Sequence, residues 1–133
     1  RKDVTGDSEY FRDNWKNLKK VSDEAFEAVK DKFTKFQKEH LKLLENERTL
    51  LDWASKQTYI ALGNMMTVAA YLGIDSCAIE GFNKKQLEKY LSDMGLLDLN
   101  VYGVSVMVSF GYRDEEQPKK IRRELKDVLE IIE

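Results

Sequence analysis

The stretch from residue 53 to residue 82, WASKQTYIALGNMMTVAAYLGIDSCAIEGF, constrains the fold more than any other part of the chain. Its first part predicts a long helix from about residue 49 to residue 72, whose second half has almost no polar face. A helix that is apolar nearly all round is expected to be buried on all sides. Lys56, Gln57 and Asn64 interrupt the apolar run well short of the roughly 20 residues that a membrane span needs. The stretch therefore predicts a core helix.

Gly73 follows the last apolar residue of this helix, at the position where a left-handed residue commonly ends a helix. Residues 74–79 form a short apolar run that predicts a strand, and Glu80 and Gly81 follow its end. Open α/β sheets place ligands at such strand ends. For an isolated Glu-Gly pair, a turn that only closes a strand is the more common interpretation.

The N-terminal part of the chain predicts two amphipathic helices, at residues 8–20 and 22–38, the second with Ser22 as its N-cap. Residues 40–48 either continue the second helix or form a junction to the long helix. Gly63 lies inside the long helix at a cost of roughly 1 kcal/mol relative to alanine. A close approach by the backbone of a neighbouring element would offset that cost.

The C-terminal part predicts a short helix that is capped by Asn83 and ends at Gly95. Residues 102–112 alternate between bulky and small side chains, which predicts a strand. Residues 125–132 form a short apolar segment that we expect to be helical and to need a surface to pack against. We expect residues 1–133 to form a single domain, since no internal repeat or linker divides them.

Charge and composition argue against several classes of protein. The 22 basic and 24 acidic residues leave a net charge of −2, which argues against a general nucleic-acid binder. The single cysteine, Cys77, excludes an internal disulfide and favours a reducing, cytoplasmic compartment. We interpret Cys77 as a small buried apolar residue and His40 as a helix-surface or junction residue. The sequence contains no metal-ligand spacing, glycine-rich phosphate loop or serine nucleophile motif, so we expect no metal site.

Several short motifs occur in a definite order along the chain, and the set is more specific than any one member. They are Trp53, Gln57, Tyr59, Gly63-Asn64, Ala70, Leu72-Gly73, Ile79-Glu80-Gly81-Phe82, Tyr102-Gly103-Val104-Ser105-Val106, Phe110-Gly111-Tyr112 and Pro118-Lys119-Lys120-Ile121-Arg122. This pattern resembles the nitroreductase family of FMN-dependent NAD(P)H oxidoreductases. The resemblance covers nearly all of the chain but only the C-terminal part of the family's domain, which usually carries an Arg-x-Ser motif further upstream.

The resemblance implies an α+β, nitroreductase-like fold, rich in helix, in which helices pack on a mixed β-sheet whose remaining strands come from sequence upstream of this chain. It also implies an intertwined homodimer with FMN at the subunit interface. NAD(P)H would reduce the flavin, leave, and be replaced by a nitroaromatic, a quinone or a similar small-molecule acceptor. Neither a nucleic acid nor a membrane is expected as a partner.

An isoalloxazine ring performs hydride transfer itself, so the protein must bind and orient it, and no catalytic side chain is expected. By the resemblance, Ala78, Ile79, Glu80 and Gly81 bind the cofactor, and Gly81 allows its backbone N–H to approach the N5 region of the ring. Relatives often carry proline where this chain has Ala78.

Lys120 and Arg122 match a Lys-x-Arg motif that contacts FMN in the family. Cationic side chains suit a phosphate, and the planar fork of arginine supplies paired hydrogen bonds. From the residues alone, a solvated loop is the more common interpretation of this basic cluster. Relatives often have proline soon after the motif, whereas Glu124 follows here.

A rival interpretation belongs to another class. The chain would be a non-catalytic fragment or dimerisation module, with the helical core and a dimer-forming surface but without the upstream half of the flavin site.

Phe33 and Phe36 would line a substrate channel in the family arrangement, although core packing explains them equally well.

Overall fold

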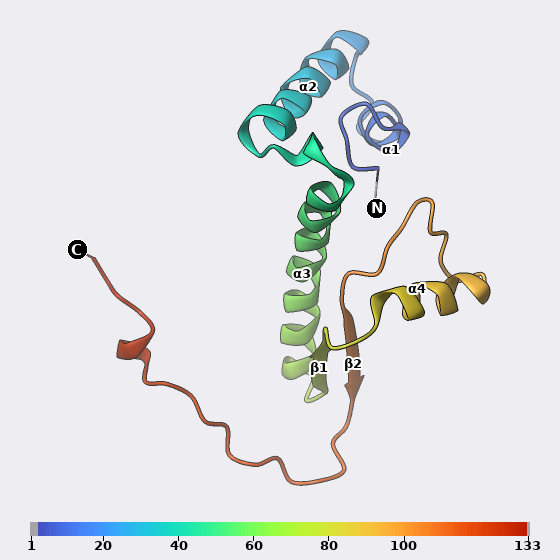
Figure 1. Ribbon diagram of the computed structural model, residues 1–133. Coiled ribbons are helices and arrows are strands. Elements are labelled where there is room, and N and C mark those ends of the chain that lie inside the picture. Colours follow the sequence, from blue (N-terminus) through green and yellow to red (C-terminus); the bar gives the residue numbers. More distant parts are fainter. Residues whose placement is uncertain (1–2, 133) are drawn as a thin grey trace.

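The computed structural model describes residues 3–132, which form mostly helices and two short strands. The elements are α1 (Glu9–Asp13), a π-helical turn (Asn14–Leu18), α2 (Asp23–Lys35), a second π-helical turn (Phe36–His40), a 3₁₀ turn (Leu43–Glu45), α3 (Glu47–Tyr71), β1 (Asp75–Ile79), α4 (Lys84–Asp93), β2 (Met107–Gly111) and a last 3₁₀ turn (Leu125–Asp127). Figure 1 shows α3 as the axis, with α1 and α2 at its N-terminal end and the two strands beside its C-terminal half. The helix-rich α+β class is confirmed.

The long helix α3 begins and ends within two residues of the prediction. At its start, the Asn46 side chain accepts a hydrogen bond from the Thr49 amide at 2.9 Å. At its end, Gly73 adopts a φ of 71°, its amide donates to the Ala70 carbonyl, and the Ile74 amide donates to the Ala69 carbonyl at 2.8 Å. These bonds satisfy carbonyls that a helix end leaves unpaired, and they turn the chain back along the helix. The predicted glycine stop is confirmed.

The burial of α3 differs from the prediction. Only Ala54, Leu62 and Ala69 are buried, and their spacing of seven to eight residues marks a single stripe. Large apolar side chains on other faces are exposed, among them Ile60 and Val68 at 63% and 56%. The prediction of burial on all sides was wrong for this chain, because the elements packed against α3 cover only part of its circumference. Apart from its chain neighbours and the surrounding backbone of α3, Gly63 has no heavy atom of the described residues within 4 Å of the position that a Cβ would take, so the expected close backbone approach is absent.

The N-terminal helices are organised around aromatic side chains. Ser8 and Ser22 accept hydrogen bonds from the amides three residues on, so both act as N-caps. Phe26 is 2% exposed, and Phe33 stacks on Phe11 with ring centroids 4.9 Å apart. Trp53 of α3 lies 6.3 Å from Phe33, which ties this helical group to the axis.

Residues 36–46 form a junction rather than one continuous helix. α2 widens into the π-helical turn, and Lys42 then adopts a left-handed φ of 52° before the 3₁₀ turn. The buried Gln37 side chain donates to the Val4 carbonyl at 3.0 Å, which holds the N-terminal segment against this junction. Of the two alternatives left by the sequence, the junction is therefore correct.

The two strands form one antiparallel sheet, in which Asp75 pairs with Gly111 and Ile79 with Met107. The described residues form only this antiparallel pair, so the mixed character of the sheet stays a prediction. The strand predicted over residues 102–112 is also shorter than expected, because the five residues of β1 offer partners only to residues 107–111. The chain between the two strands contains α4. As predicted, this helix is capped by the Asn83 side chain and ends before Gly95.

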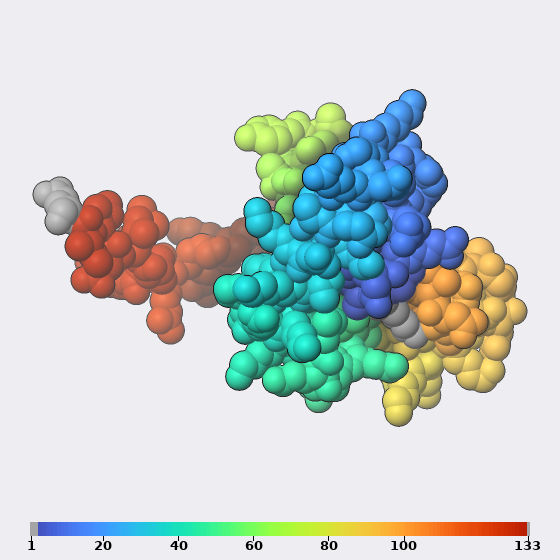
Figure 2. Space-filling view, turned by 90° about the horizontal axis from the view of Figure 1, so that it is seen from above, coloured from blue at the N-terminus to red at the C-terminus, as the bar shows by residue number. Residues whose placement is uncertain are grey.

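Residues 112–132, which we call the tail, extend away from the helices and strands (Figures 1 and 2). Its apolar side chains are exposed; Ile121 and Ile132 reach 92% and 88%. The predicted C-terminal helix was wrong, since only a 3₁₀ turn at Leu125–Asp127 forms. A short helix is marginal without a surface to pack on, and no such surface lies against the tail in the described chain.

Substitution by alanine is expected to change the stability in opposite directions at Gly63, inside α3, and at Gly73, just after its end. Gly73→Ala should lower the free energy of unfolding by about 1–2 kcal/mol, because alanine is strained in the left-handed region. Gly63→Ala should raise it by up to about 1 kcal/mol, because the helical site has open space for a methyl group. Urea unfolding followed by circular dichroism would measure both. A destabilising Gly63→Ala would contradict the open environment of Gly63.

Candidate functional site

The turn after β1 exposes backbone at the strand end that the sequence singled out. The Phe82 amide donates to the Glu80 carbonyl at 2.9 Å, which closes a tight turn around Gly81. Apart from Gly81 itself and its two neighbours in the chain, no heavy atom of the described residues lies within 4 Å of the position that a Cβ on Gly81 would occupy. Ala78 and Ile79 precede this turn in β1, paired with Val108 and Met107. The backbone at Gly81 is therefore open to approach by a ligand.

The Glu80 carboxylate is anchored to α3 through Tyr59, whose hydroxyl donates a hydrogen bond to it. This hydrogen bond, with some desolvation, raises the pKa of Tyr59 above its ordinary value. Tyr59 therefore stays a neutral donor throughout the physiological pH range. In the sequence, Tyr59 is part of the family pattern and is otherwise interpreted as a core residue, because a contact across 21 residues leaves no local periodic signal.

A second contact from α3 reaches the segment before β2. The Thr58 and Ser105 hydroxyl oxygens lie 2.8 Å apart, and Thr58 also donates to the Ser55 carbonyl at 2.7 Å. On the other side of this segment, the Val104 amide donates to the Glu88 carboxylate of α4 at 2.9 Å. The residues that enter β2 are thus held from both α3 and α4.

Lys120 and Arg122 lie on the tail, away from the Glu80–Gly81 turn. Lys120 lines an open hollow of about 550 Å³ beside Asp75, the first residue of β1. Arg122 is exposed and donates to the Ile121 carbonyl at 2.9 Å. Since Glu80 follows the last residue of β1, a single chain places the two groups of predicted cofactor-binding residues at opposite ends of that strand.

An ion pair that no sequence pattern predicts holds the start of the tail, at Arg113, against β1. The Arg113 guanidinium donates through Nε to Asp75 at 2.6 Å and through Nη2 to the other carboxylate oxygen. Its Nη1 donates to Gln117 Oε1 at 2.7 Å. The Arg113 hydrogen bond lowers the pKa of Asp75, and the same contact raises the pKa of Arg113. In the sequence, Asp75 lies in the strand predicted over residues 74–79 and Arg113 follows the strand predicted over residues 102–112, and no local pattern pairs them.

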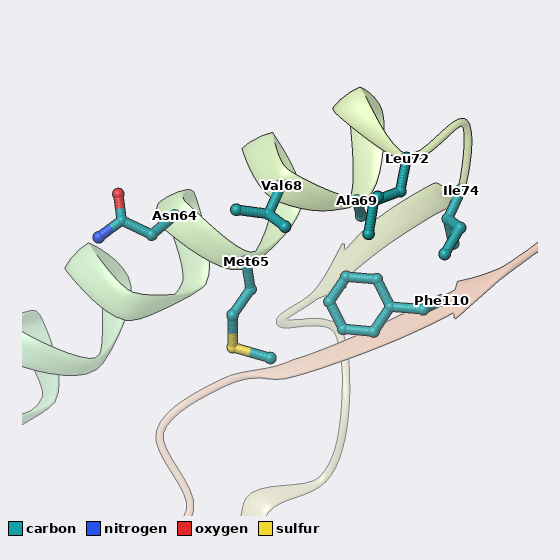
Figure 3. Close-up of a pocket in the computed structure, with 7 residues that line it drawn as sticks. All are labelled: Asn64, Met65, Val68, Ala69, Leu72, Ile74 and Phe110. Atoms are coloured by element: carbon teal, nitrogen blue, oxygen red, sulfur yellow. The ribbon is translucent and has the colours of Figure 1, made fainter.

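Two hollows on the body are lined mainly by apolar side chains. One, of about 410 Å³, lies between the C-terminal half of α3 and Phe110, with Met65 and Phe110 pointing toward each other (Figure 3). The other, of about 630 Å³, lies between the N-terminal helices and α3 and includes Phe33 and Trp53. Phe36 does not line it and instead stacks on His40, with ring centroids 6.3 Å apart.

A family model and the relatives of known sequence point to the same protein family. A family model described as "Nitroreductase family" matches residues 9–112. A Staphylococcus haemolyticus protein is 51% identical over 99% of this chain and 60% of its own length, and Bacillus subtilis YfkO is 46% identical over 98% of the chain and 59% of its own length. Both relatives carry the printed name "Putative NAD(P)H nitroreductase". The chain thus spans about 60% of the length of the curated relatives that it matches.

The family match fills most of the chain, so it does not support the prediction that the chain is only the C-terminal part of the family's domain. Among the described residues, no helix is long and apolar enough to cross a membrane. The same residues contain no group of three or more histidine, cysteine or acidic side chains that would hold a metal ion.

Acidification is expected to weaken the ion pair between Asp75 and Arg113 that holds the start of the tail. Because the folded pKa of Asp75 is lowered, its pairing with Arg113 contributes stability that is fully present above the unfolded pKa and is lost as the pH falls through the folded value. With an ordinary aspartate pKa of about 3.9, the change should occur below about pH 4. The NMR signal of the Arg113 side-chain N–H would report it.

Asp75→Asn is the matched control, because it keeps the side-chain shape without the titrating carboxyl. Its Arg113 signal should not change over the pH range in which the wild-type signal moves. An Arg113 signal that moves equally in both proteins would show that another group is responsible.

Proposed function

The chain belongs to the nitroreductase family, and on this premise we propose that it carries part of the flavin site of an FMN-dependent NAD(P)H oxidoreductase. One observation carries the proposal. The open Gly81 backbone lies at a strand end, next to a carboxylate that α3 holds in place. A flat ring needs such an unobstructed backbone surface, and a glycine with open space at its Cβ position supplies it. When bound, FMN would accept hydride from NAD(P)H and pass it to a second substrate.

In this proposal, the protein's own residues bind and orient the cofactor. Ala78, Ile79, Glu80 and Gly81 form the side that faces the flavin, and the Gly81 N–H is available as a hydrogen-bond donor. Lys120 and Arg122 supply positive charge for the phosphate, and both are exposed. Their chemistry fits FMN, but one chain keeps them apart from Gly81.

We therefore propose a homodimer with FMN at the subunit interface. The exposed apolar side chains of α3 and of the tail support a second copy as partner, because apolar surface of this extent is normally covered. In this proposal, residues 1–133 act as a single domain in the cytoplasm. The proposed partners are small-molecule acceptors such as nitroaromatics or quinones, and the name nitroreductase that the relatives carry supports a nitro compound.

The alternative is a non-catalytic dimerisation module. The distance between the two groups of cofactor-binding residues within one chain favours it, as do the exposed faces of α3. The full-length protein decides between the two. NAD(P)H oxidation that requires FMN and a nitroaromatic or quinone acceptor supports the enzyme, and no FMN-dependent oxidation would rule it out.

Removing the phosphate-binding cations should weaken FMN binding. Each charge-assisted hydrogen bond contributes about 1.5–3 kcal/mol, so Lys120→Gln with Arg122→Gln should lower FMN affinity at least about tenfold. Retention of the flavin absorbance after desalting, followed by a titration, would measure this. Lys119→Gln with Arg123→Gln removes the same charge from the same segment and should bind FMN much more tightly than the first pair. Equal losses in the two variants would contradict a specific role for Lys120 and Arg122.

A further inference from the structure

We propose that Thr58 and Tyr59 of α3 form a two-point clamp that positions the Glu80–Gly81 turn. They are positioning residues, since they act through Glu80 and Ser105. This role rests on the flavin site proposed above and adds to it the elements that hold its geometry.

Both contacts of the clamp lie at the same end of the two-stranded sheet, where β1 ends and β2 begins. In the antiparallel register, the last residue of β1, Ile79, pairs with the first residue of β2, Met107. Glu80 follows Ile79, and Ser105 lies two residues before Met107. The segment that leaves β1 and the segment that enters β2 therefore lie at the same end of the sheet, and each is hydrogen-bonded to α3.

Helix and strand geometry explain why adjacent helix residues reach these two segments. Gly73 turns the chain back, so distances along α3 and β1 can be compared from that point. The 14 residues from Tyr59 to Gly73 span about 21 Å of helix, and the seven residues from Gly73 to Glu80 span about 23 Å of extended chain. Tyr59 and Glu80 are therefore level with each other. Thr58 points about 100° away around the helix, which lets it reach Ser105 instead.

The Tyr59 contact restricts the turn in a way that matters to a ligand. A phenol that donates to a carboxylate forms a charge-assisted hydrogen bond, which limits the conformations of Glu80. The Glu80 carbonyl accepts from the Phe82 amide, so the same residue also sets the direction of the Gly81 N–H between them. A turn that is ordered before binding costs less entropy when the ligand arrives. The clamp thus preorganises the Gly81 N–H.

Two substitutions with matched controls test the clamp in the full-length protein. Tyr59→Phe removes the bond to Glu80, whereas Tyr90→Phe removes an exposed hydroxyl from α4, away from the turn. Thr58→Val removes the contact with Ser105 together with a bond to a helix carbonyl, whereas Thr67→Val removes only the equivalent bond to a helix carbonyl. The measurements are the NMR amide signal of Gly81 without FMN, the FMN dissociation constant, and the midpoint potential of bound FMN.

We expect Tyr59→Phe to shift and broaden the Gly81 signal, to weaken FMN binding about fivefold, and to change the midpoint potential. Thr58→Val should have a smaller effect in the same direction, and both controls should match the wild type. Because Tyr59 acts through Glu80, Tyr59→Phe combined with Glu80→Gln should be no weaker in FMN binding than Glu80→Gln alone. A potential change separates positioning from a general loss of stability.

The clamp and the flavin site fail in distinguishable ways. If the wild type binds no FMN, the proposed function fails, and the Gly81 signal in the FMN-free protein still decides on the clamp. A Gly81 signal in Tyr59→Phe that is identical to that in Tyr90→Phe would overturn the clamp. If the wild type binds FMN, equal affinities and potentials for those two variants would also overturn it.

Discussion

The left-handed end of α3 at Gly73 is the constraint on which the rest of the structure depends. The amides of Gly73 and Ile74 satisfy carbonyls of the last helical turn, and the chain reverses direction without a long loop. β1 therefore runs back along the helix that precedes it (Figure 1). This reversal brings Glu80 level with Tyr59, and it gives β2 a strand to pair with.

The described chain leaves much of its apolar surface uncovered. α3 buries one stripe, while the tail exposes Ile121 and the residues beyond it. Burial of apolar side chains is the main favourable term in folding, so exposed faces of this size favour association. The same observation underlies the homodimer proposed for the flavin site. It also explains why the apolar end of the tail does not form its predicted helix.

The proposed site draws on two parts of the chain that are held by different contacts. Glu80 and Gly81 lie at a sheet edge that is held from α3, whereas Lys120 and Arg122 lie on the tail beyond the Asp75–Arg113 ion pair. Such a division suits a cofactor with a flat ring and a charged end. The ring needs a fixed backbone surface, while the phosphate can be bound by cations on an extended segment. The Asp75–Arg113 ion pair fixes the point from which that segment leaves the sheet.

Local patterns in the sequence determined the start and end of α3, the caps at Ser8, Ser22 and Asn83, and the turn after β1. Each of these depends on residues within a few positions of one another, which is why spacing reveals them. Which face of α3 is buried, the short antiparallel sheet, and the contacts of Tyr59 with Glu80 and of Asp75 with Arg113 were decided only by tertiary structure. These features join residues that are 21 or more positions apart, and hydrophobic periodicity says nothing about which distant partner a side chain meets.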